Sequence, residues 1–116
     1  IYALDPSNGE LKEQPSYYID EYELGKIVFG PGERYLIKPS GVAVHPISGN
    51  IYVIASVGQA LVVIDRQNNV LHFELLDPGL YPQPEGITFS PNGDLFISSE
   101  GKASEPKIVR YKAPVN

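Results

Sequence analysis

PSGVAVHP at residues 39–46 and PEGITFSP at residues 84–91 follow one pattern and are separated by 45 residues. Each is followed by a glycine-containing turn and a second apolar run, GNIYV at 49–53 and GDLFI at 93–97. A match of this length, with prolines bracketing both first runs, indicates an internal repeat. The sequence therefore contains two copies of one unit built from short apolar runs.

Each copy can be divided into short strands. Val42 and Val44 alternate with Ala43 and His45, as expected for a half-buried strand. A period near 45 residues with several strands in each unit is typical of β-propeller blades. In the first copy, strands are predicted at 41–45, 51–55, 60–65 and 70–76. In the second copy, the first strand starts at residue 84, and two more span 95–98 and 106–112.

We therefore predict an all-β chain, a β-propeller of four-stranded antiparallel blades present as about two to two and a half blades. Propellers usually have four to eight blades, so we expect part of a longer propeller, completed by further chain or by self-association. The predicted divisions are residues 1–14, strands three and four of one blade; 15–38, an inserted loop or cap; 39–76, a complete blade; and 77–116, a final blade without its fourth strand.

The segment from 15 to 38 interrupts the repeat. Its apolar runs Ile27–Phe29 and Tyr35–Ile37 are predicted to form short strands. One interpretation is a surface loop whose charges are solvated. The other is a cap over one face of the propeller, where Tyr17, Tyr18 and Tyr22 contact a ligand. The sequence leaves both open.

Composition narrows the classes of partner. Fourteen acidic residues against nine lysines and arginines give a net charge of −5, which disfavours a surface that binds phosphate backbones, so we expect no nucleic-acid partner. The chain has no cysteine, which excludes disulfides and thiolate chemistry. No apolar run approaches the length of a transmembrane helix. Partners are therefore expected to be a small molecule or a protein.

The same segments resemble the SdiA-regulated protein family. The resemblance rests on residues 39–46, 48–53 and 61–65, and on QPEGITF at 83–89 with GDLFISSE at 93–100. Propellers of the NHL and gluconolactonase types are close competitors. The resemblance implies a six-bladed propeller of the bacterial cell envelope, exported or anchored, with no settled biochemical activity. It therefore implies an extracytoplasmic location.

Three residues are candidates for ligand binding. Glu85 lies in the first strand of its blade, which in a propeller runs nearest the central axis, and Ser40 occupies the aligned position in the preceding copy. Carboxylates near the axis suit Ca²⁺, which takes six to eight oxygen ligands, so Glu85 is also the candidate metal ligand. Glu100 follows a second strand, where strand ends open on one face. A solvated carboxylate is the alternative for both glutamates.

Two functions remain in competition. The first is a non-enzymatic envelope module that binds a ligand or a partner at the channel mouth or on the capped face. The second is a Ca²⁺-dependent hydrolase of the lactonase or phosphoesterase type, with the ion near Glu85. The sequence contains no nucleophile elbow or dinucleotide fingerprint, so no catalytic residue is assigned.

Overall fold

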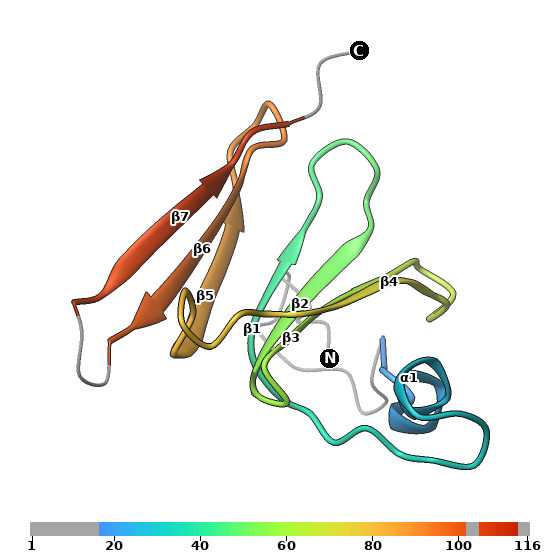
Figure 1. The fold of residues 1–116 in the computed structure, drawn as a ribbon. Coiled ribbons are helices and arrows are strands. Elements are labelled where there is room, and N and C mark those ends of the chain that lie inside the picture. Colours follow the sequence, from blue (N-terminus) through green and yellow to red (C-terminus); the bar gives the residue numbers. More distant parts are fainter. Residues whose placement is uncertain (1–16, 102–104, 114–116) are drawn as a thin grey trace, which may run out of the picture.

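The computed structural model describes residues 17–101 and 105–113. In these residues one short helix precedes two antiparallel sheets, a four-stranded sheet in the order β1-β2-β3-β4 and a three-stranded sheet in the order β5-β6-β7 (Figure 1). The elements are α1 (Glu21–Val28), β1 (Lys38–Val44), β2 (Ile51–Val57), β3 (Ala60–Ile64), β4 (Val70–Leu75), β5 (Gln83–Phe89), β6 (Leu95–Glu100) and β7 (Lys107–Tyr111).

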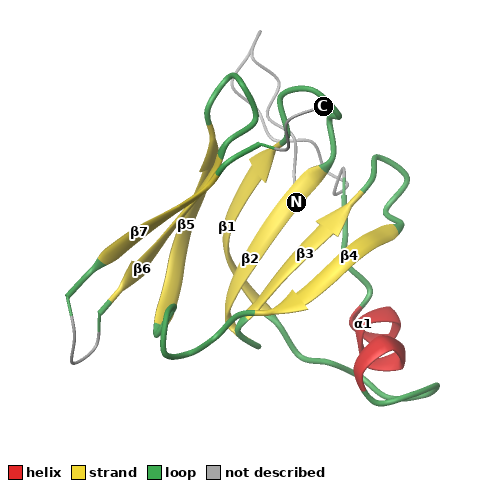
Figure 2. Ribbon diagram, turned by 45° about the horizontal axis from the view of Figure 1, so that its top comes forward, coloured by secondary structure: helices red, strands yellow, loops and turns green. Residues whose placement is uncertain are grey.

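The two sheets are two neighbouring blades. Their first strands, β1 and β5, lie side by side, while β4 and β7 lie at the outer ends of the sheets (Figure 2). The strands predicted within both copies are confirmed, with bounds that differ by up to three residues. The strands predicted within residues 1–14 lie outside the described residues. None of the described residues forms a helix long and apolar enough to cross a membrane.

The prediction of short strands between residues 15 and 38 is wrong. Ile27 and Val28 end helix α1, and residues 35–37 carry no strand but lead into β1. The helix begins because the Asp20 side chain accepts a hydrogen bond from the Tyr22 N–H at 2.9 Å, which caps its first turn. Acidic residues in the first turn and Lys26 in the last complement the helix dipole.

One hydrophobic cluster joins α1 to the first sheet. Leu24 is fully buried against a sheet face that includes Val53, Val62 and Ile64. The segment after the helix returns along it, and the Tyr35 N–H donates to the Glu21 carbonyl oxygen at 2.9 Å. Residues 17–37 therefore pack against one face of the first blade, and a cap over a face of the propeller stays a prediction.

A second cluster joins the two blades. Ile54 and Leu61 from the first sheet pack with Ile97 of β6 and with Tyr81, which precedes β5. Strands β2 and β3 thus contribute to both clusters, and every residue of β3 is buried. Burial on both faces explains why β3 reads as a continuous apolar run rather than an alternating one.

His45 connects the first hairpin to the second blade. Its Nδ1 accepts hydrogen bonds from the N–H groups of Ile47 and Ser48, both at 3.2 Å, and so caps the β1–β2 turn. The imidazole ring packs against Tyr52 and Phe89, with 4.8 Å between the His45 and Phe89 ring centroids. His45 therefore has a structural use in this turn.

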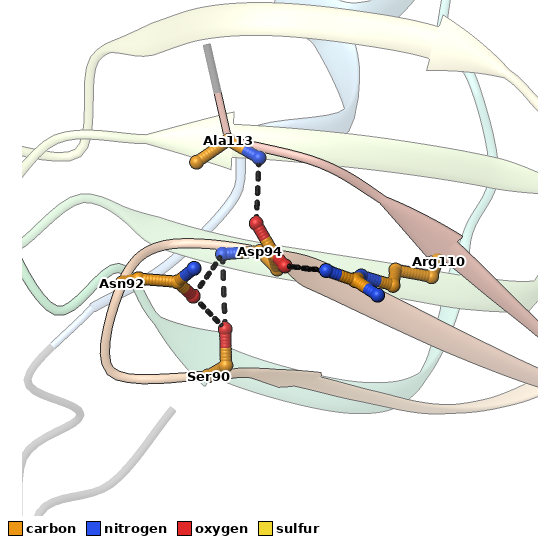
Figure 3. A network of polar contacts seen from close by, with 5 residues as sticks. All are labelled: Ser90, Asn92, Asp94, Arg110 and Ala113. Atoms are coloured by element: carbon orange, nitrogen blue, oxygen red, sulfur yellow. Dashed lines mark hydrogen bonds and ion pairs between the residues drawn. The ribbon is translucent and has the colours of Figure 1, made fainter. Parts of the chain in front are cut away.

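The corresponding turn of the second blade is held by a carboxylate. Asp94, which is 5% exposed, accepts hydrogen bonds from Arg110 Nη2 at 2.7 Å and from the Ala113 N–H at 2.8 Å (Figure 3). Its own N–H donates to Ser90 Oγ at 3.2 Å, and the Ser90 hydroxyl hydrogen-bonds to the Asn92 side chain. The Ala113 N–H, followed by the Arg110 guanidinium, holds the pKa of Asp94 below its usual range.

We expect Asp94 to make stability depend on pH. Because its pKa is lower in the folded state, its contribution is complete above the ordinary aspartate pKa and is lost as the pH falls through the folded value. Asp94→Asn should lower the melting temperature at pH 7 by about 5 °C. The difference between wild type and variant should shrink at pH 3. Melting curves at both pH values test this, and an unchanged difference would contradict it.

Candidate functional site

Ser40 and Glu85 occupy equivalent positions in the two blades. The pairing of β1 with β2 passes from Pro39 to Gly41, and that of β5 with β6 passes from Pro84 to Gly86, so Ser40 and Glu85 are the extra residues of two bulges. A bulge re-aims the chain and often lies next to a functional site. The alignment of the two copies made from the sequence is confirmed at this point.

The Ser40 hydroxyl connects the inner strands of the two blades. Ser40 Oγ donates to the Pro84 carbonyl oxygen at 2.7 Å. Gly41 lies so near β5 that a Cβ at this position would be 3.2 Å from the Glu85 carbonyl oxygen. Ser40 therefore supports the segment that carries Glu85, and ligand contact by Ser40 itself stays a prediction.

Glu85 and Glu100 line the same pocket. The pocket has a volume of about 410 Å³, and its walls come from β5, the end of β6 and the start of β7. Gln83 pairs with Glu100 in the β5–β6 ladder, which places the end of β6 beside the start of β5. Two carboxylates chosen separately from the sequence thus belong to one site.

Ser99 fixes the relative position of these two strand ends. The side chain is 3% exposed, and its Oγ accepts a hydrogen bond from the Gln83 N–H at 3.0 Å. Gly86 lies so near Ser98 that a Cβ at this position would overlap Ser98 Oγ, and the Ser98 hydroxyl would have to turn away. The hydrogen bond from Gln83 to Ser99 therefore holds β5 and β6 together beside the pocket that Glu85 and Glu100 line.

Lys107 adds a positive charge to the site. It pairs with Ser99 in the β6–β7 ladder and lines the pocket with Glu85 and Glu100. Lys107 was not predicted as a site residue, because its place in the pocket follows from the register of β7 against β6. Among the described residues that line the pocket, two carboxylates and one ammonium give a formal charge of −1, which favours a cationic ligand or a ligand with both charges.

Glu85 was also the predicted metal ligand, and Glu100 is the other carboxylate that lines its pocket. Among residues 17–101 and 105–113, no group of three or more histidine, aspartate or glutamate side chains is placed to hold a metal ion. Ca²⁺ also accepts carbonyl, hydroxyl and water oxygens, so two carboxylates are compatible with a share of its coordination shell. Ca²⁺ binding stays a prediction.

A second pocket lies at the helix. It has a volume of about 480 Å³ and is lined by Tyr18 and Tyr22, with Glu21 and Arg34. Glu21 accepts hydrogen bonds from the Ile37 N–H at 2.8 Å and from Arg34 Nε at 2.9 Å, and these two partners lower its pKa. The charged groups here hold the returning segment in place, so this pocket is the weaker candidate for a ligand site.

Two adjacent antiparallel sheets with their first strands side by side are the arrangement of neighbouring blades, so the chain forms part of a β-propeller. The chain belongs to the SdiA-regulated family, whose model matches residues 32–103. It is also similar in fold to a solved luciferin-regenerating enzyme, with a TM-score of 0.57 and 20% sequence identity. That match covers 94% of this chain and 36% of the enzyme. Among curated proteins no match is found.

Proposed function

We propose that this chain forms part of a ligand-binding propeller and that the pocket of Glu85 and Glu100 is its binding site, with Ca²⁺ as the bound cation. One observation carries the proposal. Glu85, the bulge residue of β5, and Glu100, the last residue of β6, line the same pocket with their carboxylates. The proposed role is binding rather than catalysis.

The chemistry of the pocket favours a hard cation. Carboxylates are ligands that Ca²⁺ prefers, and Glu85 and Glu100 are accompanied by the hydroxyl of Ser98. Neither a thiol nor an imidazole lines the described part of the pocket, so it does not have the ligand types that select zinc or copper. Solvent and residues outside the pocket would complete the coordination.

The test is a melting curve with and without Ca²⁺. A ligand that binds only the folded state stabilises it by about 2.7 kcal/mol at one hundred times its dissociation constant. Millimolar Ca²⁺ should therefore raise the melting temperature of the wild type by several degrees, and Glu85→Gln should remove most of the increase. The matched control is Glu23→Gln on α1, an exposed glutamate outside the pocket, which should keep the full increase.

Two outcomes would contradict the proposal. One is a wild type whose melting temperature does not change at millimolar Ca²⁺. The other is a Glu85→Gln variant that responds as fully as Glu23→Gln does. Replacing Glu100 by glutamine distinguishes a shared site from a site at Glu85 alone, because only a shared site loses affinity in both variants.

We also propose an extracytoplasmic location in a bacterial cell envelope. The support is membership of the SdiA-regulated family, whose proteins are expected to be exported or anchored. Fractionation of cells that express the protein from its natural gene tests this proposal. Recovery with the cytoplasmic fraction alone would contradict it.

A further inference from the structure

A cavity of about 380 Å³ lies between the two blades, away from the pocket of Glu85 and Glu100, with which it shares no lining residue. Much of its wall is apolar and comes from Leu61 and Leu76 of the first blade and Leu95 and Ile97 of the second. Its volume is in the range of small-molecule sites, which are mostly apolar with a few well-placed polar groups. The polar groups therefore decide which ligand would fit.

Two tyrosines contribute polar groups and aromatic rings. The Tyr81 and Tyr111 hydroxyls hydrogen-bond to each other across the cavity wall. Tyr81 is 2% exposed, and its burial, followed by the bond to Tyr111, raises its pKa well above the ordinary tyrosine value. Tyr81 therefore remains a neutral phenol at physiological pH. Electron-rich aromatic rings attract organic cations.

Two carboxylates also line the cavity. Asp77 accepts a hydrogen bond from the Gly79 N–H at 2.8 Å through Oδ1. Glu74 Oε2 lies 3.2 Å from His72 Nε2, at a position where both side chains are more than half exposed. No lysine or arginine is among the described residues that line this cavity. The lining thus combines negative charge with apolar and aromatic surface.

We propose that the cavity between the blades binds a small organic ammonium ion that carries an apolar group. The apolar group occupies the leucine and isoleucine walls, and the ammonium lies near the carboxylates of Glu74 and Asp77 and the tyrosine rings. A neutral molecule of the same shape lacks the charge interactions, and an anion is repelled by the two carboxylates. Charge selectivity is therefore the property to measure.

The test compares three probes of similar shape with the 116-residue chain: 4-phenylbutylammonium, 4-phenylbutanol and 4-phenylbutyrate. Binding is followed by calorimetry and by changes in amide NMR spectra at low salt. The ammonium should bind about tenfold more tightly than the alcohol, and the carboxylate should bind most weakly. Equal affinity for ammonium and alcohol, or no binding of the ammonium, would overturn the proposal.

Variants locate the site. Glu74→Gln should weaken ammonium binding about fivefold and leave alcohol binding unchanged, because an exposed ion pair contributes modestly. Leu80→Trp, at a cavity residue that is 38% exposed, should block all three probes. Glu23→Gln is the matched control and should change nothing. Ammonium binding that Glu74→Gln does not weaken overturns the proposal, and this result does not depend on whether Leu80→Trp folds. Ammonium binding that survives in a folded Leu80→Trp variant also overturns it.

Discussion

Ile54→Ala should destabilise the protein by about 3–4 kcal/mol, because removal of a large buried aliphatic side chain combines lost burial with a cavity. Ile54 is fully buried in the cluster that joins the blades, where it packs with Leu61, Tyr81 and Ile97. A single blade cannot bury both of its faces, so this cluster stabilises the arrangement of the two sheets as well as each sheet. Urea unfolding, followed by circular dichroism, gives the free energy.

The matched control is Ile47→Ala, which makes the same chemical change in the first turn, where Ile47 is 78% exposed. Its free energy of unfolding should remain within about 0.5 kcal/mol of the wild type. If Ile54→Ala lowers the free energy of unfolding as little as Ile47→Ala does, the packing between the blades contributes little to stability. In that case the two sheets would not behave as neighbouring blades of one propeller in solution.

The repeat allowed most of the sheet structure to be predicted. Strand positions follow from the 45-residue period, because equivalent residues of two blades have equivalent neighbours. The alignment even paired Ser40 with Glu85, which the structure places at equivalent bulges. It could not predict the bulges themselves, since an unpaired residue in a ladder depends on contacts with the neighbouring strand rather than on local sequence.

Helix α1 is hard to predict because it has only eight residues, too few for a helical period to be clear. Asp20 at the cap and acidic residues in the first turn were present in the sequence. The runs Ile27–Phe29 and Tyr35–Ile37 are short apolar runs, which by themselves do not distinguish a strand from a helix. The burial of Leu24 against the first sheet then stabilises an eight-residue helix that would be marginal in isolation.

Glu85 and Glu100 were predicted as separate candidates, and the pocket that they share was not predicted. Glu85 and Glu100 were chosen for different reasons, and the β5–β6 register brings them to one pocket. The cavity between the blades was not predictable, because Leu61 and Tyr111 belong to different sheets and their approach depends on how the blades pack. Contacts between repeats are tertiary, whereas the strands within each repeat are encoded locally.

Gly25→Ala should destabilise the protein by about 2–3 kcal/mol, although alanine is about 1 kcal/mol better than glycine in a helix. The reason is a close approach of backbone to backbone. A Cβ at Gly25 would overlap the carbonyl oxygen of Glu33 and lie 2.7 Å from the Arg34 nitrogen. Both atoms belong to the backbone, so the segment 33–37 has to move away from α1. This movement weakens the hydrogen bonds from that segment to Glu21.

The matched control is Gly79→Ala, where the nearest atom to an added Cβ is a side-chain oxygen of Asp77 at 3.2 Å, which can give way. This variant should remain within about 1 kcal/mol of the wild type. Both free energies come from urea unfolding under the same conditions. A Gly25→Ala variant as stable as the wild type would contradict the close packing of helix and returning segment. Residues 33–37 would then pack less closely on α1 than the burial of Leu24 implies. The substitution would change stability only through the higher helix propensity of alanine.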